Sequence, residues 1–363
     1  MTADTDRNDG EAFRRKALIL EALDRHPYCP AWWLPNGHAQ TVFATLVRRA
    51  PAIVARRERW ETPDGDFIDL HFRDGDPKQP TVLILHGLEG SAQSKYVLGL
   101  HRLFAQLGWT SVALEFRGCG SEMNRAPRLY HSGETTDLAH VARRLAEDRR
   151  ILCAVGISLG GNVLAKWLGE MGGAATTLIR AAAVVSAPFD LTISGPHIDQ
   201  AVGGAYARHF LKKLIAKATE KERQYPGVID IERAKRCRTL YEFDDCATAM
   251  LHGFSGADEY WRTQGCGQFL SGIRVPTMLL SSADDPFNPA GTLPREQASA
   301  SPYLIPQFTE RGGHVSFVYG ATPLTCGYWA EEQVVRYFEV IHQYRDVVTP
   351  VFRDNAGEVG ARS

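Results

Sequence analysis

The sequence predicts an α/β fold, in which a mostly parallel open sheet has helices on both faces. Two observations carry this prediction. Apolar runs of strand length recur along the chain, and segments with a helical spacing of apolar residues lie between them. Nearly continuous apolar strands are typical of a parallel sheet that is covered on both faces. The alternation of strand and helix is what right-handed crossovers between such strands require.

Six apolar runs are expected to form the parallel strands. Helical spacing is found in residues 96–108, 135–148 and 330–345, where apolar residues recur three and four positions apart. Residues 56–77 alternate apolar and polar side chains around a Pro-Asp-Gly turn, which is typical of an antiparallel hairpin at a sheet edge. The six runs are "TVLILH" (81–86), "TSVALEF" (110–116), "ILCAVG" (151–156), "AAAVVSAP" (181–188), "VPTMLLSSADDP" (275–286) and "YLIPQFTE" (303–310).

These segments divide the chain into five parts. Residues 1–50 are expected to be an N-terminal extension with a helix that packs on the core, and residues 51–188 are the first half of the α/β core. Residues 189–272 contain no convincing strand and include an amphipathic helix candidate, so we interpret them as a helical cap over the carboxyl edge of the sheet. Residues 273–345 complete the core, and residues 346–363 are a loose C-terminal tail. The polar residues 1–10 are also expected to be loose.

Composition and charge exclude several classes of function. The formal net charge is −1, so there is no electrostatic case for a nucleic-acid partner. The seven cysteines include no C-x-x-C pair, which argues against a disulfide framework or a zinc site and fits a reducing compartment. The polar N-terminus is unlike a signal peptide, and no apolar run approaches the roughly 20 residues of a transmembrane helix. We therefore expect a cytoplasmic protein with no integral membrane segment; nothing in the sequence indicates an oligomeric state.

The predicted cap is basic over part of its length. From Arg208 to Arg238 it has ten Lys or Arg residues against four Asp or Glu residues. We favour a solvated helix face, and the alternative is peripheral contact with anionic lipid headgroups. Four apolar residues of the cap either line an acyl channel or form the cap's own core: Phe210, Leu214, Phe254 and Trp261.

A serine stands at the end of the third predicted parallel strand. The stretch "ILCAVGISLGGNVLAKW" (151–167) places Ser158 in a G-x-S-x-G pattern with Gly156 and Gly160, where an apolar run gives way to a helical pattern. A sharp strand-to-helix turn lifts such a serine above the sheet and needs small neighbours. It also points the amide donors of the following helix at the serine oxygen. This context predicts a nucleophile, and the alternative is a serine that only caps the helix.

A serine hydroxyl becomes a nucleophile when a base takes its proton, and a carboxylate orients that base. In this strand–turn–helix context the acid and then the base follow the serine along the chain. Asp285 follows the run that begins at 275, and His314 follows the run that begins at 303, in a glycine-containing loop. Asp284 is the rival acid, and we prefer Asp285 because it directly precedes Pro286. A capping aspartate and a surface histidine are the alternative to a triad with Ser158.

Acyl transfer also needs hydrogen-bond donors for the oxyanion. The first predicted parallel strand ends in "HGLEG" (86–90), whose turn presents main-chain N–H groups beside the serine. We expect the amides of Leu88 and Leu159 to form the oxyanion hole, one from each loop. His86 is interpreted as a residue that shapes this loop rather than as a second base.

Six longer stretches of the sequence carry a family resemblance: "WLPNGHAQTVF", "LHGLEGSAQSKYVLGL", "FRGCGSEMNRAPRLYHSGETTDL", "VGISLGGNVLAKWLGE", "ADDPFNP" and "RGGHVSFV". With them the chain resembles the α/β-hydrolase superfamily and, more narrowly, the YheT-like or AB hydrolase 4 family of serine esterases. The resemblance covers roughly residues 33–338 and implies an α/β-hydrolase fold with Ser158, Asp285 and His314 as the charge relay. This chain has Cys119-Gly120-Ser121 where the family often has the order C-S-G.

The predicted function is hydrolysis of carboxylic esters, either short- to medium-chain acyl esters or lipid esters, through the Ser-Asp-His triad and an acyl-enzyme; the substrate is a small molecule or a lipid. No cofactor and no metal are expected to take part. The alternatives are acyl transfer to an alcohol or thiol on the same triad, and a non-catalytic binding protein on this scaffold.

Two polar stretches lack an obvious catalytic part. They are "NGHAQT" (36–41) and "NRAPRLYHSGET" (124–135). They are either a pocket wall, with Arg117, His131 or Glu134 near the substrate, or a hydrogen-bonded network that supports the serine turn. We favour the network, because buried polar loops need internal partners.

Overall fold

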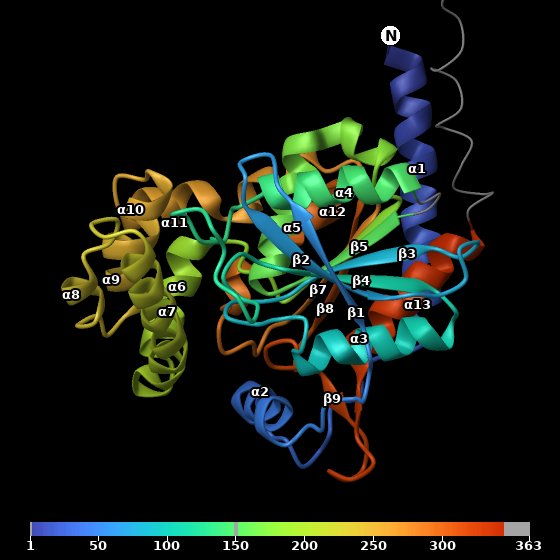
Figure 1. The fold of residues 1–363 in the computed structure, drawn as a ribbon. Helices are drawn as coiled ribbons and strands as arrows, with labels where there is room; N and C mark the ends of the chain where they lie inside the picture. Colours follow the sequence, from blue (N-terminus) through green and yellow to red (C-terminus); the bar gives the residue numbers. More distant parts are fainter. Residues whose placement is uncertain (1, 149–151, 345–363) are drawn as a thin grey trace, which may run out of the picture.

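An eight-stranded sheet runs through the centre of the computed structural model, which describes residues 2–148 and 152–344 (Figure 1). The strand order is β1-β2-β4-β3-β5-β6-β7-β8. Neighbouring strands from β4 to β8 are parallel, whereas β1 and β2 form an antiparallel hairpin at one edge. The strands are β1 (Arg56–Glu61), β2 (Phe67–Arg73), β3 (Thr81–Leu85), β4 (Thr110–Glu115), β5 (Leu152–Ile157), β6 (Ala181–Val185), β7 (Thr277–Ser282) and β8 (Leu304–Thr309).

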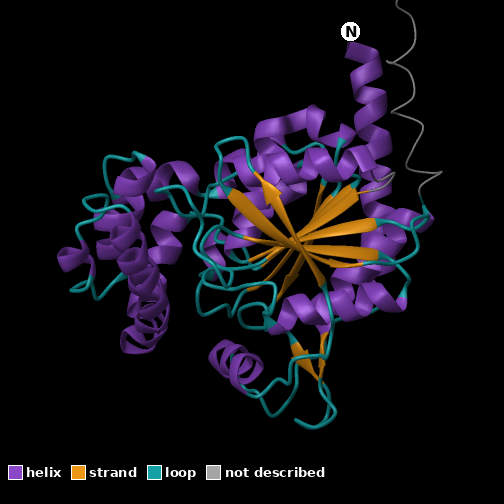
Figure 2. Ribbon diagram, in the orientation of Figure 1, coloured by secondary structure: helices purple, strands orange, loops and turns teal. Residues whose placement is uncertain are grey.

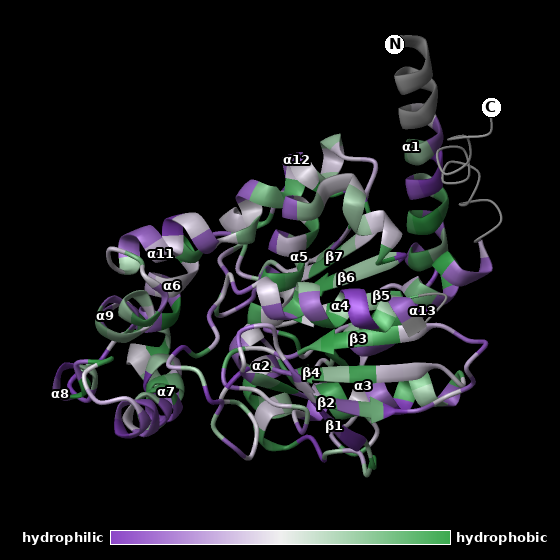
Figure 3. Cartoon of the chain, turned by 45° about the horizontal axis from the view of Figure 1, so that its top comes forward, coloured by the Kyte–Doolittle hydropathy of each residue, from purple (hydrophilic) through white to green (hydrophobic). Residues whose placement is uncertain are grey.

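Helices cover both faces of this sheet (Figure 2). One apolar core lies under α4 (Thr136–Asp148), α5 (Leu159–Met171) and α12 (Arg295–Ala300). A second core lies on the opposite face, under α1 (Thr2–Asp24), α3 (Lys95–Gln106) and α13 (Trp329–Gln343). Figure 3 shows the hydrophobic colour concentrated on the strands between these layers. The predicted α/β fold is confirmed, because every residue of β3 to β7 is buried.

The register of the parallel strands brings their carboxyl ends to one edge. Leu85 at the end of β3 pairs with Gly156 in β5, and β6 pairs with β7 through Val185 and Leu280. The loops that follow β3, β5, β6 and β7 therefore leave the sheet side by side. Side chains on these loops meet although they are far apart in sequence, which is why ligands bind at this edge in open α/β sheets.

The prediction of a loose segment at residues 1–10 is wrong for residues 2–10, which belong to helix α1. The buried side chains of Ile19 and Leu23 anchor the other end of this helix on the sheet. Once a helix is nucleated by packing, each further residue adds a hydrogen bond without a new nucleation step. The polar start of the chain therefore continues a helix that the apolar residues establish. The predicted tail at 346–363 lies outside the described residues.

Residues 189–272, which we call the cap, contain helices and no strand, and all of them are described by the structure. Helices α6 to α11 stand together beside the sheet (Figure 1) and enclose an apolar cluster of their own, whereas Phe189, Cys266 and Leu270, at the two ends of this segment, belong to the core cluster under α5. Trp261 is buried in that cluster, with Phe210, Leu214 and Phe254 packed against it. The elements are α6 (Leu191–Gln200), η2 (Ala201–Gly204), α7 (Ala205–Gln224), α8 (Ile231–Ala234), α9 (Leu240–Phe243), η3 (Asp244–Thr248), α10 (Ala249–His252), α11 (Ala257–Gln264) and η4 (Cys266–Gly272).

Two of the cap's lysines point inward rather than to solvent. Lys221 is fully buried and donates to the main-chain oxygens of Asn124 and Ala126, each at 2.8 Å. Lys217 pairs with Glu89 of the core at 2.7 Å. The count of basic residues in the sequence therefore overstates the charge that this segment presents to solvent. Contact of the remaining basic residues with a membrane surface stays a prediction.

Smaller elements complete the fold. Helix α2 (Gly37–Leu46) lies beside a two-stranded ribbon formed by β9 (Val318–Tyr319) and β10 (Gly327–Tyr328), at the bottom of Figure 1. Two 3₁₀ turns, η1 (Gly172–Thr177) and η5 (Ala290–Thr292), connect the larger elements. In the described ranges 2–148 and 152–344, no helix combines the length and apolar character needed to cross a membrane.

Arg117, directly after β4, is the centre of a buried ion network. Its guanidinium donates to Asp137 at 2.6 and 2.7 Å, to Asp66 at 2.8 Å and to Asp64 at 2.8 Å. The same Asp66 carboxylate accepts from the Asn124 side chain at 2.7 Å. The network ties the β1–β2 hairpin turn to α4 and to the loop after β4. The structure thus places Arg117 in a supporting network, one of the two interpretations left open by the sequence.

We expect Arg117→Met to lower the free energy of unfolding by about 3–5 kcal/mol, because it leaves buried carboxylates without their counter-charge. Arg125→Met is the matched control, since Arg125 pairs with Glu61 at the surface, where an ion pair contributes about 1 kcal/mol or less. Urea unfolding at pH 7 measures both. Arg117 lowers the pKa of Asp64, so this part of the stability is present above about pH 4 and is lost as the pH falls further. Equal losses in the two variants would contradict the network's role.

Candidate active site

Ser158 occupies a sharp turn between β5 and α5. Its backbone has φ 55° and ψ −118°, a conformation that side chains rarely adopt. A Cβ on Gly156 would lie 2.3 Å from the carbonyl oxygen of Gly160, and a Cβ on Gly160 would lie 2.5 Å from the carbonyl oxygens at the end of β3. Both glycines of the G-x-S-x-G pattern are therefore needed for the turn to close. The Ser158 side chain makes no capping hydrogen bond to α5. The alternative in which this serine only caps the helix is therefore not what the structure shows.

His314 links Ser158 to a carboxylate. Its Nε2 lies 2.9 Å from Ser158 Oγ, and its Nδ1 lies 2.9 Å from Asp285 Oδ2. The Asp285 side chain is fully buried and the His314 side chain is 9% exposed. The structure thus brings together the three residues that were predicted from separate motifs, at the ends of β5, β7 and β8.

The two neighbouring aspartates have different partners. Besides His314, the Asp285 carboxylate accepts hydrogen bonds from the main-chain N–H of Phe287 at 2.8 Å and from the Asn288 side chain at 3.2 Å. The Asp284 carboxylate instead accepts from the main-chain N–H of Gly313 at 2.9 Å. Asp284 supports the histidine loop, whereas Asp285 holds the imidazole.

The histidine loop rests on helix α2. The main-chain N–H of His314 donates to Thr41 Oγ1 at 2.9 Å, and Thr41 donates to the carbonyl oxygen of Gly37 at 2.7 Å. A Cβ on Gly37 would lie 1.8 Å from the carbonyl oxygen of Asp284, so this helix approaches the acid loop at main-chain contact distance. The stretch "NGHAQT" is a supporting network, which is the interpretation that we favoured from the sequence.

Two further side chains hold the loops in place. Ser186, just after β6, accepts from the main-chain N–H of Val315 at 3.1 Å, and its carbonyl oxygen accepts from the Asn288 side chain at 3.0 Å. Sequence reasoning did not single out Thr41, Ser186 or Asn288. Asn288 lies in the quoted "ADDPFNP" motif, three residues after Asp285. This closeness to the predicted acid was the sequence signal that could have identified Asn288 as its partner.

The predicted oxyanion donors flank Ser158. A Cβ on Gly87 would lie 3.1 Å from Ser158 Cβ, so the loop after β3 passes directly beside the serine. Leu88 is the next residue of that loop, and Leu159 is the first residue of α5. Among the described residues, the structure gives neither main-chain N–H a hydrogen-bond acceptor. Neither N–H is thus used by another group in the part of the chain that the structure describes.

His86 is fixed inside the protein. Its Nδ1 donates to the carbonyl oxygen of Gly87 at 2.8 Å, and its Nε2 accepts from the main-chain N–H of Phe116 at 3.1 Å. Burial lowers the pKa of His86 to about 4, so the ring is neutral near pH 7. With both ring nitrogens occupied, His86 shapes the loop that contains Leu88.

Aromatic rings of the cap reach the His314 ring through Phe287, which follows β7 and lies outside the cap. The Phe287 ring lies 4.3 Å from the His314 ring, and Tyr206 and Phe210 of α7 contact Phe287 at 4.8 and 5.9 Å between ring centroids. Tyr206 also stacks on His38 of α2, with its hydroxyl 3.1 Å from His38 Nδ1. One face of α7 therefore packs aromatic rings against Phe287, the residue that contacts the His314 ring.

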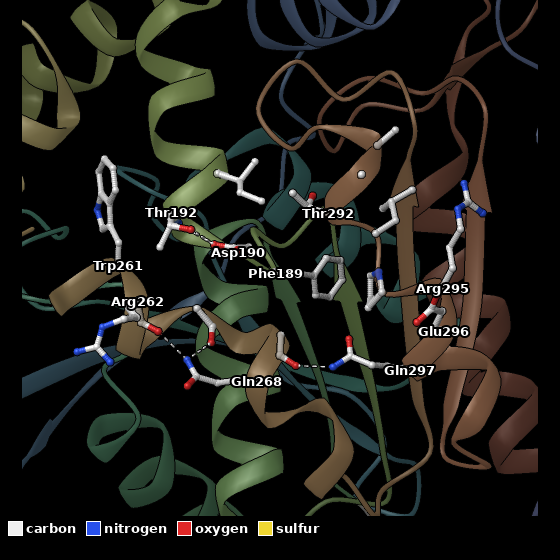
Figure 4. Close-up of a pocket in the computed structure, with 17 residues that line it drawn as sticks. Phe189, Asp190, Thr192, Trp261, Arg262, Gln268, Thr292, Arg295, Glu296 and Gln297 are labelled. Carbon is white, nitrogen blue, oxygen red and sulfur yellow. Dashed lines mark hydrogen bonds between the residues drawn. The ribbon is translucent and has the colours of Figure 1, made fainter. Parts of the chain in front are cut away.

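A separate groove of about 730 Å³ lies between the cap and the core (Figure 4). Its walls come from the segments after β6 and β7 and from α11. Ser158, Asp285 and His314 do not line it. The lining includes Phe189, Asp190, Thr192, Ile193, Trp261, Arg262, Gln268, Leu293 and Arg295.

Comparison with known proteins identifies the fold and the family. The family model for the alpha/beta hydrolase fold matches residues 80–321. "Putative esterase YheT" of Escherichia coli (strain K12) is 38% identical over 314 residues, covering 85% of this chain and 91% of that protein. "Phospholipase ABHD3" of Mus musculus is 27% identical, covering 88% of this chain and 80% of that protein. The solved Pyrococcus furiosus esterase Pf2001 shares the fold, with a TM-score of 0.51 at 16% identity over 83% of this chain and 96% of that one.

The strand order, the serine turn after β5 and these matches lead to the same conclusion. The chain belongs to the α/β-hydrolase fold family and is YheT-like.

Proposed function

We propose that the protein hydrolyses carboxylic esters through an acyl-enzyme on Ser158. The observation that carries the proposal is the continuous hydrogen-bonded chain from Ser158 Oγ through His314 to Asp285, with both contacts at 2.9 Å. Relatives named as an esterase, a phospholipase and a monoacylglycerol lipase support ester chemistry. An intact chain of this kind also argues against a non-catalytic role.

Each residue has a defined part in the reaction. His314 Nε2 takes the proton of Ser158 as Oγ attacks the ester carbonyl, and the amides of Leu88 and Leu159 bind the oxyanion. Asp285 holds the Nδ1–H tautomer and stabilises the imidazolium. His314 then donates its proton to the leaving alcohol, and water repeats the sequence on the acyl-enzyme.

The surroundings of His314 favour an apolar group next to the scissile bond. Phe287, Tyr206 and Phe210 supply aromatic surface on the cap side of the histidine. Apolar surface of this kind binds acyl chains by removing them from water. We therefore propose short- to medium-chain acyl esters or lipid esters as the substrate class.

Ser158→Ala is expected to abolish turnover of p-nitrophenyl esters and labelling by a fluorophosphonate probe, because no oxygen remains to be acylated. Measuring wild-type rates over a series of acyl lengths then reports the length that the site prefers. Wild-type turnover that persists in Ser158→Ala would contradict the proposal. Product analysis with added ethanol separates hydrolysis from acyl transfer to an alcohol.

Asp285→Asn is expected to lower kcat by about 10⁴-fold, because an amide no longer favours the Nδ1–H tautomer of His314. Asp284→Asn is the matched control: its amide oxygen can still accept from the Gly313 N–H, so we expect a much smaller loss. Steady-state kinetics on one ester compares them. A larger loss in Asp284→Asn would reverse the assignment of the acid.

Ser158→Gly is expected to raise the free energy of unfolding by about 1 kcal/mol relative to Ser158→Ala, because glycine adopts positive φ without steric cost. Urea unfolding of the two inactive variants provides the measurement. A lower stability of Ser158→Gly would show that the positive φ at position 158 does not strain a residue that has a Cβ.

A further inference from the structure

Glu89 lies in a turn directly beside the expected oxyanion donor. The main-chain N–H of Gly90 donates to the carbonyl oxygen of Gly87 at 3.0 Å, which makes Leu88 and Glu89 the two central residues of a turn. Glu89 has φ 53°, and glycine is the usual residue at the second central position when φ is positive. Its side chain is only 2% exposed. A strained, buried glutamate at this position needs strong partners.

The partners hold both the main chain and the carboxylate of Glu89. Its main-chain N–H donates to the Tyr130 hydroxyl at 2.8 Å, and that hydroxyl lies 2.8 Å from Glu89 Oε1. From the cap, Lys217 Nζ donates to Glu89 Oε1 at 2.7 Å, and Lys213 Nζ donates to the Glu89 carbonyl oxygen at 3.2 Å. Lys213 and Lys217 are one turn apart on α7, so a single helix face reaches the loop at two points.

Lys217 supplies the charge that balances Glu89. Burial opposes a charged lysine, but Cys119 and Glu89 outweigh burial and hold the pKa of Lys217 above its ordinary value. Lys217 Nζ also donates to Cys119 Sγ at 2.9 Å. Burial raises the pKa of the Cys119 thiol to about 11, so the thiol is neutral near pH 7. The ion pair of Lys217 is therefore with Glu89.

We propose that Lys217 of the cap is a positioning residue, which acts through Glu89 to hold the Leu88 amide in its oxyanion-binding orientation. The inference rests on the proposed function, since the amide has this role only if Ser158 is acylated. Glu89 is covalently next to Leu88 within one hydrogen-bonded turn, so relaxation of its positive φ reorients the neighbouring peptide groups. A donor displaced from its position stabilises the transition state less, because the benefit depends on preorganisation.

The consequence is that the cap takes part in catalysis as well as in substrate binding. The oxyanion loop keeps its strained turn while α7 is seated against it. Loss of the pair should affect the transition state and leave binding of the ground-state ester largely unchanged, because the carbonyl becomes an oxyanion only as the reaction proceeds.

The test compares two lysines of α7 that differ in what they touch. Lys217→Met removes the charge that pairs with Glu89, and Lys212→Met removes an exposed charge from the same helix. We expect Lys217→Met to lower kcat for a p-nitrophenyl ester by about 10- to 100-fold, less than the loss of a whole oxyanion donor, with KM changed less than about 2-fold. Lys212→Met should match the wild type.

Two further measurements separate positioning from folding. An alkyl boronic acid forms a tetrahedral adduct on Ser158 that places an oxygen in the oxyanion hole. Its Ki should rise in Lys217→Met by a factor similar to the fall in kcat/KM. Lys217→Arg should recover part of kcat, because it restores the charge. Glu89→Gln keeps the shape of the side chain and should reduce kcat in the same way. The double variant Glu89→Gln/Lys217→Met should lose much less than the product of the single losses.

The opposite outcomes overturn the inference. The first is an unchanged kcat in both Lys217→Met and Glu89→Gln, and the second is a rise in KM with kcat unchanged. The third is a double variant whose loss of kcat equals the product of the two single losses. Urea unfolding shows whether each variant is folded, and if Lys217→Met fails to fold, Lys217→Arg and Glu89→Gln decide the matter. A wild-type protein with no Ser158-dependent turnover would instead contradict the proposed function, so the two failures are distinguishable.

Discussion

The backbone of Ser158 is the constraint on which the rest of the site depends. With φ 55° between a buried strand and a helix, it forces Gly156 and Gly160 into contact with neighbouring main chain and presents Oγ at the sheet edge. A conformation of this kind costs of order 1–3 kcal/mol and persists only where the surroundings over-determine it. Two apolar cores, one on each face of the sheet, provide those surroundings.

Positive φ angles recur in the loops around Ser158. Glu89, Ser186, Val315 and Phe317 all have them. Each of these loops is held by hydrogen bonds from another element: Glu89 by Tyr130 and α7, and the loop after His314 by Ser186. Helix α2 adds a further support through Thr41. Each loop of the site is thus held by at least one hydrogen bond from another segment of the chain, which is how a preorganised site is supported.

The cap meets the core in two ways: Phe189, Cys266 and Leu270 join the apolar core cluster under α5, and helix α7 makes polar contacts with the core. Other apolar residues of the cap form a cluster of their own. The polar contacts with the core come from Lys217, Lys221 and the Tyr206–His38 pair, and Phe210 packs on Phe287. Charged groups in such contacts require defined partners, since an unpaired buried charge is strongly unfavourable. The position of α7 is therefore specific, which is the basis for the proposed role of Lys217.

The sequence by itself indicated the fold class, the eight strands of the main sheet and several of the helices that flank it, and it singled out Ser158, Asp285 and His314. Strand burial, helical spacing and the glycines around Ser158 are local signals that depend on neighbours in sequence. Contacts between distant segments were decided only by the tertiary structure. The contact of Asp285 with His314, the support of His314 by Thr41 and the pairing of Glu89 with Lys217 each join residues that are far apart in the chain. The helical start of α1 and the inward lysines of α7 were likewise beyond local pattern, because packing against the core decides which polar residues are ordered and which face solvent.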